Sequence, residues 1–175
     1  MSTNWRISSF NGALLAAYFI PTWTIVAFNI MVSPIHALYE RPNIAVALFL
    51  SDHLQLTGIN TVRAAWLLAL GKLTVAGFFV LFLAFIVRAA IRKAGSGDEA
   101  LAIALAIGSV ISFASMVMAS QVGETQALRL HATELLMLLG TAIVMLVEHP
   151  APSVTPRGAT PDALGPDQPR LLNNS

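Results

Sequence analysis

The chain has 175 residues, of which 56% are hydrophobic and only 11% charged, and its formal net charge at pH 7 is +1. A soluble domain of this length could not bury so much apolar surface, so the composition predicts an integral membrane protein. The near-zero net charge argues against a nucleic-acid partner. Because the sequence contains no cysteine, it excludes disulfides, thiolate-bound metals, iron–sulfur clusters and covalent c-type haem attachment.

Four apolar segments are long enough to cross a bilayer core of about 30 Å, which takes roughly 20 residues in helical form. They cover residues 10–33, 62–87, 100–120 and 128–147. The first is longer than the roughly 7–15 apolar residues of a signal peptide, so we expect it to be retained as a transmembrane helix. Pro21 lies in its middle and predicts a kink there.

Two further segments complete the expected organisation. Residues 43–51 (NIAVALFLS) are apolar but too short to span, which predicts an interfacial helix between the first two spans. Residues 150–175 carry six of the nine prolines and few large apolar side chains, so we expect a tail that is disordered or ordered by a partner. The sequence therefore predicts an all-α bundle of four transmembrane helices, residues 1–149, followed by a Pro-rich extended tail, residues 150–175.

The basic residues predict how the bundle is oriented. With four spans, the loop between the second and third spans shares one side of the membrane with both termini. That side holds Arg6, Arg88, Arg92 and Lys93 near the membrane, and the other side holds Arg41, Arg63 and Arg129. The positive-inside rule then places both termini in the cytoplasm, and we expect the membrane to be a bacterial inner membrane.

Lys72 and Glu134 are charged residues deep inside the second and fourth spans. Counted along their helices, they lie about 24 Å and about 21 Å from the cytoplasmic edge, so their depths agree. A charge at this depth is costly and usually has a partner. We therefore expect an intramembrane ion pair between Lys72 and Glu134. A proton or ion relay, or contact with a lipid or quinone headgroup, are the alternatives.

Histidines offer weaker candidates for a cofactor site. His131 and Glu134 are three residues apart and share one face of a helix, and His53 is expected on the same outer side of the membrane. Imidazole and carboxylate ligands would suit zinc, copper or iron, so His53, His131 and Glu134 form a possible metal set. His53 and His131 are also the one plausible outer pair of axial haem ligands. The simpler alternative is that these histidines bond to backbone or lipid headgroups.

Small residues line one face of the third span. Ala104, Gly108, Ser112, Ser115 and Ala119 recur at spacings of three and four residues, which is typical of helices that pack closely in membranes. This face would pack within the chain or against a partner subunit. The tryptophans, including Trp23 and Trp66, are expected to lie mostly near the membrane interfaces as aromatic anchors.

The functional prediction starts from the absence of any phosphate loop, GxSxG or HExxH motif, so no catalytic residue and no cofactor is assigned. In size and expected topology the chain resembles the DoxX-like membrane proteins, a resemblance that implies a four-helix fold and no residue's role. We expect a non-catalytic accessory or assembly subunit of a larger membrane complex, with an electron-transfer complex as one candidate and with lipid and other membrane subunits as partners. The alternatives are a haem-, metal- or quinone-binding redox protein and a small oligomeric transporter or channel.

Overall fold

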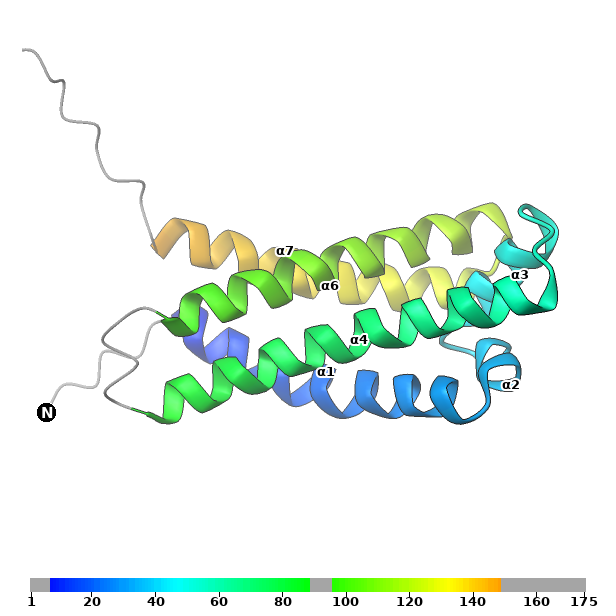
Figure 1. The fold of residues 1–175 in the computed structure, drawn as a ribbon. Coiled ribbons are helices and arrows are strands. Elements are labelled where there is room, and N and C mark those ends of the chain that lie inside the picture. The colour runs from blue at the N-terminus through cyan, green and yellow to red at the C-terminus, as the bar shows by residue number, and fades with distance from the viewer. Residues whose placement is uncertain (1–6, 89–95, 149–175) are drawn as a thin grey trace, which may run out of the picture.

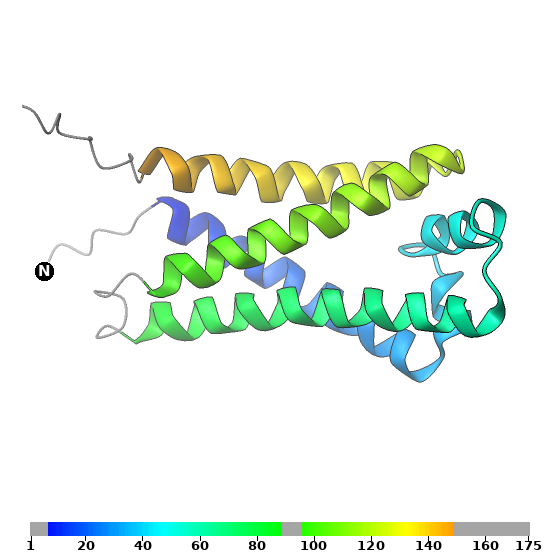
Figure 2. The same cartoon turned by 45° about the horizontal axis from the view of Figure 1, so that its top comes forward.

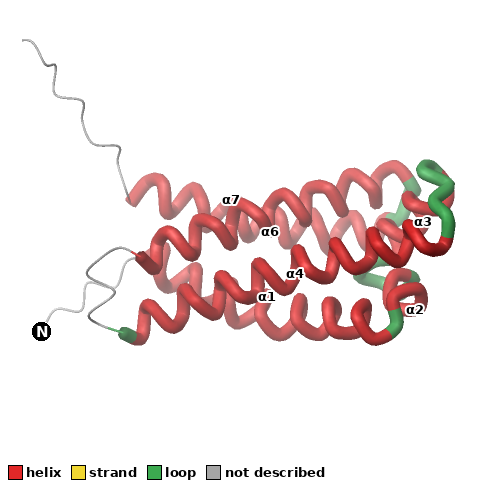
Figure 3. The backbone as a smooth tube through the Cα atoms, in the orientation of Figure 1, coloured by secondary structure: helices red, strands yellow, loops and turns green. Residues whose placement is uncertain are grey.

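The computed structural model describes residues 7–88 and 96–148, and all regular secondary structure in these ranges is helical (Figures 1 and 3). Four helices are long and apolar enough to cross a membrane: α1 (Ile7–Val32), α4 (Gly58–Val87), α6 (Ser96–Gln121) and α7 (Thr125–Glu148). The predicted all-α membrane bundle is therefore confirmed. Each helix extends a few residues beyond its apolar run, because a helix needs only its own backbone hydrogen bonds to continue past the lipid.

The link between α1 and α4 holds two short helices, α2 (Pro34–Leu38) and α3 (Ile44–Asp52). Ser33 breaks away from helical geometry because the ring of Pro34 disfavours it in the preceding residue, and Pro34 then begins α2. The helix predicted over residues 43–51 is thus confirmed as α3. Both short helices lie at one end of the bundle, and the opposite end holds the start of α1 and the end of α7 (Figure 2).

The four long helices form a closed ring in which α1 contacts α4, α4 contacts α6, α6 contacts α7 and α7 contacts α1. Their interior holds two main apolar clusters. One lies toward the end where α1 begins and includes the stacked rings of Phe19 and Phe79. The other lies toward α2 and α3 and is built around Ile30 and Leu38. The outward faces carry large exposed apolar side chains, consistent with contact with lipid.

A carboxylate joins the last long helix to the first. Glu148 at the end of α7 accepts hydrogen bonds from the backbone N–H of Ile7 at 2.8 Å and of Ser8 at 3.2 and 3.3 Å. The first N–H groups of a helix have no partner within the helix, and the helix dipole favours negative charge there. Glu148 thus satisfies the start of α1.

Some sequence predictions concern residues whose structure is not described. The tail, residues 150–175, lies outside the described ranges, as do Arg6, Arg92 and Lys93 of the orientation argument. Pro21 lies inside α1, which is helical on both sides of it.

Gly12 provides a test of how closely the helices approach. A Cβ atom added to Gly12 would lie 2.7 Å from Cζ of Phe82 and 2.9 Å from Cδ2 of Leu101, and both side chains are fully buried. We expect Gly12→Ala to lower the free energy of unfolding by about 1–3 kcal/mol, as overpacking does. Gly140→Ala, with open space at its Cβ, is the control and should be neutral or slightly stabilising. Equal unfolding curves for the two variants in detergent would contradict the packing described.

Candidate functional site

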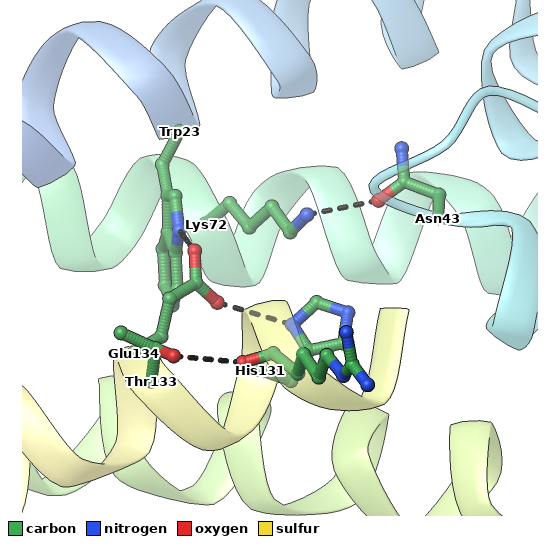
Figure 4. Close-up of polar contacts among 7 residues, drawn as sticks. Trp23, Asn43, Lys72, His131, Thr133 and Glu134 are labelled. Carbon is green, nitrogen blue, oxygen red and sulfur yellow. Dashed lines mark hydrogen bonds and ion pairs between the residues drawn. The ribbon is translucent and has the colours of Figure 1, made fainter. Parts of the chain in front are cut away.

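Five polar or amphipathic side chains meet inside the bundle, between the two apolar clusters. This central polar cluster consists of Trp23, Asn43, Lys72, His131 and Glu134 (Figure 4). None of them exposes more than 4% of its surface. They come from α1, from the link just before α3, from α4 and from α7, so the cluster joins four parts of the chain.

Glu134 is the acceptor of this cluster. Its Oε1 accepts a hydrogen bond from Nε1 of Trp23 at 3.2 Å, and its Oε2 lies 3.0 Å from Nδ1 of His131. An ionised carboxylate can only accept, so with Glu134 ionised the hydrogen is on Nδ1 of His131. The two α7 residues are three apart and share one helical face, as the sequence predicts.

Lys72 is held by a different partner. Its Nζ donates a hydrogen bond to Oδ1 of Asn43 at 2.9 Å, and it lies 5.8 Å from the centre of the Trp23 ring. The amide nitrogen of Asn43 in turn donates to the backbone oxygen of Ala37 at 3.1 Å. A buried ammonium on α4 is therefore tied to the α2–α3 link.

The structure replaces the direct Lys72–Glu134 ion pair with an indirect contact. Lys72 bonds to Asn43 while Glu134 bonds to Trp23 and His131, and the indole of Trp23 contacts both charged groups (Figure 4). The physical reason is the direction of the lysine side chain. Side chains on a helix point toward its N-terminus, which here carries Nζ toward the α2–α3 end. The two charged groups therefore lie against one shared indole ring.

The proposed metal and haem ligands do not meet. His53 is exposed at the end of α3 and stacks on Phe49, whereas His131 is buried in the central polar cluster. Within residues 7–88 and 96–148, no group of three or more histidine, aspartate or glutamate side chains is arranged to hold a metal. Of the set His53, His131 and Glu134, only the last two lie together.

The small-residue face of α6 turns inward. Ala104, Gly108, Ser112 and Ser115 are all buried. A Cβ atom on Gly108 would lie 3.3 Å from Leu138 of α7 and 3.5 Å from Val75 of α4. This face therefore packs against the chain's own helices, which was one of the two alternatives left open by the sequence.

One ring nitrogen in the cluster has unused bonding capacity. Nε2 of His131 is fully buried and has no hydrogen-bond partner among the described residues, and the same holds for the hydroxyl of Ser112. With the hydrogen on Nδ1, Nε2 of a neutral imidazole is an acceptor. It can accept a hydrogen bond from a buried water molecule or from a hydroxyl group of a ligand.

Two members of the cluster were missed by the sequence reasoning. Trp23 was expected at an interface, but it is 98% buried. Its position in the sequence indicates burial, because Trp23 lies nine residues before the end of α1. That corresponds to a depth of about 13 Å in the membrane, which is too deep for an interfacial anchor. Asn43 gave no such signal, since its role depends on how the α2–α3 link folds back over the bundle.

Comparison with protein-family models, with curated proteins and with solved structures finds no match for this chain.

The indirect contact between the two buried charges can be measured by a double-mutant cycle. Lys72→Met alone, or Glu134→Gln alone, should destabilise the bundle by about 1–4 kcal/mol, because each leaves polar groups without partners at membrane depth. The double variant should recover part of that loss, with a coupling on the order of 1 kcal/mol. Unfolding in bicelles gives all four free energies.

The matched control for this cycle is Arg63→Met, which removes an exposed positive charge from the same helix. Its effect should add to that of Glu134→Gln without coupling. A coupling for Lys72 no larger than that for Arg63 would show that Lys72 and Glu134 do not interact.

Proposed function

We propose that this chain is a non-catalytic accessory or assembly subunit of a larger membrane complex, of which an electron-transfer complex is one class. The proposal places it in a bacterial inner membrane with both termini in the cytoplasm. The observation that carries it is that the buried polar groups form hydrogen bonds with other residues inside the bundle. Lys72 bonds to Asn43, and Glu134 bonds to Trp23, so these groups join α4 to the α2–α3 link and α7 to α1.

This arrangement differs from what transport or catalysis requires. A relay or a transport path needs polar groups exposed to water or to a substrate along a route through the bundle. Here the same groups are closed off by two apolar clusters and by the α2–α3 link. These groups form hydrogen bonds that hold the bundle together, which supports a role as a rigid membrane module.

The exterior of the bundle has faces that a partner subunit would cover. Large apolar side chains are exposed on all four long helices, for example Phe28, Leu67, Val110 and Leu136. Lipid covers such faces in a lone protein, and neighbouring transmembrane helices cover them in a complex.

A second candidate is a quinone-binding redox protein, and one atom favours it. Nε2 of His131 is a buried acceptor without a partner among the described residues. A quinol hydroxyl would donate a hydrogen bond to this nitrogen, while Nδ1 of His131 stays bonded to Glu134.

Purification of the full chain from its native membrane in a mild detergent decides between the two candidates. If the accessory-subunit proposal is right, native electrophoresis should show the chain in an assembly well above its own 18.7 kDa, with a fixed ratio to a named partner. Any quinone extracted from the same sample should belong to the partner subunits and should therefore be retained in His131→Phe. A stable monomer with its own turnover contradicts the proposal. Stoichiometric quinone that is lost in His131→Phe would instead support the second candidate.

A further inference from the structure

The central polar cluster consists of two hydrogen-bonded halves. In one half, Nζ of Lys72 donates to Oδ1 of Asn43. In the other half, Glu134 accepts from Trp23 and lies against Nδ1 of His131. No hydrogen bond joins these two groups of described residues directly, and they share only the indole ring of Trp23. Each half keeps unused bonding capacity, and the two capacities are of opposite kind.

The unused donors belong to Lys72, and the unused acceptor belongs to His131. An ammonium group has three N–H donors, and Oδ1 of Asn43 is the one acceptor that they reach within the described part of the chain. Nε2 of His131 is fully buried and has no partner among the same residues. With the hydrogen on Nδ1, Nε2 carries a lone pair. Leaving such groups unpaired in the interior is costly, so both need a further partner.

The fold brings the donor and the acceptor to the same level of the bundle. Lys72 lies 16 residues before Arg88 at the end of α4, and His131 lies 17 residues before Glu148 at the end of α7. Both Cα atoms are therefore about 24–26 Å from that end of the bundle. Both helices begin toward α2 and α3, and side chains lean toward the start of their helix. Figure 4 shows the Lys72 ammonium and the His131 ring extending from Trp23 toward the side on which Asn43 lies.

A water molecule has the chemistry to join the two groups. Its oxygen accepts a hydrogen bond from an ammonium, and its O–H donates one to an imidazole nitrogen. Buried waters in proteins bind polar groups that otherwise have no partner, and each water needs at least two of them. None of the five cluster residues exposes more than 4% of its surface, so the site has no open route for a larger ligand.

We propose that one water molecule is bound inside the bundle between Nζ of Lys72 and Nε2 of His131. It accepts from the ammonium and donates to the imidazole. The water makes the cluster one continuous chain of hydrogen bonds, from Asn43 of the α2–α3 link through α4 and α7 to Trp23 of α1. The site does not depend on the proposed function, but it uses the nitrogen that the second candidate would offer to a quinol.

The test is proton-detected solid-state NMR of the full chain with labelled lysine and histidine. The chain is washed free of native lipid in detergent and reconstituted in bilayers of synthetic phosphatidylcholine without quinone. We expect a cross-peak between water protons and Nε2 of His131. After transfer to D2O it should decay more slowly than the water contact of His53, which is exposed. Two hydrogen bonds through a water also place Nζ of Lys72 and Nε2 about 4.5–5.5 Å apart, which a dipolar distance measurement checks.

Three variants locate the water. Lys72→Met removes the ammonium and should abolish the cross-peak at Nε2 of His131. Arg63→Met removes an exposed positive charge from the same helix and should leave the cross-peak unchanged. Ser112→Ala removes a different buried hydroxyl without a partner among the described residues, and it should also leave the cross-peak unchanged. If Lys72→Met does not fold, the cross-peak, its decay and the distance between the two nitrogens in the wild-type chain still decide.

Four outcomes would overturn the proposal. One is a wild-type chain without any water contact at Nε2 of His131. Another is a distance of about 3 Å between Nε2 and Nζ of Lys72, which leaves no room for a water between them. The third is a hydroxyl contact that appears only when native lipid extract is restored, which would assign the site to a quinol. The fourth is a cross-peak that Ser112→Ala abolishes and Lys72→Met retains, which would place the water against α6.

Discussion

The cost of keeping a charged group away from water governs this structure. Lys72 and Glu134 are both about 96–97% buried in a bundle whose surroundings offer no water. Moving one unpaired charge into such an environment costs about 2.5–3.5 kcal/mol on insertion scales. Each group instead has hydrogen-bond partners, Asn43 of the α2–α3 link for Lys72, and Trp23 of α1 and His131 of the same helix for Glu134. The two opposite charges leave the cluster close to neutral.

Meeting this requirement shapes the fold beyond the four spans. Asn43 reaches Lys72 only because Pro34 ends α1 and the chain folds back through α2 toward the bundle interior. The ring of Trp23 packs in the apolar cluster that includes Phe19 and Phe79, and its N–H donates a hydrogen bond to Glu134. The polar cluster thus fixes the relative positions of α1, α4, α7 and the α2–α3 link. Apolar contacts between helices are less specific, because the side chains of a membrane helix are as apolar as the lipid around them.

The sequence predicted the architecture well because membrane spans follow from length and hydropathy alone. The four long helices and α3 were expected, and each helix begins and ends within four residues of the predicted range. The depths of Lys72 and Glu134 were also sufficient to place them in one region. Their actual partners were not predictable, because Asn43 enters through the fold of a link and Trp23 through its rotation on α1, and neither is set by hydropathy.

The same limit applies to the predicted cofactor site, because spacing in the sequence places residues of one helix together but does not place residues of different segments together. His131 and Glu134 are neighbours on one helix, so their contact follows from sequence spacing. His53 was grouped with them only because it was expected on the same side of the membrane. Sharing a side does not bring two residues together, and in the fold His53 lies exposed at the end of α3.

The most direct measurement of the central claim is solid-state NMR of the full chain in lipid bilayers, with labelled lysine, asparagine, histidine and glutamate. We expect dipolar coupling between Nζ of Lys72 and the side-chain amide of Asn43, which are joined by a hydrogen bond of 2.9 Å, and between Nδ1 of His131 and the carboxylate of Glu134. We also expect slow hydrogen exchange at Nζ. A Lys72 ammonium that exchanges rapidly with solvent and couples to neither Asn43 nor any other side chain would contradict this claim.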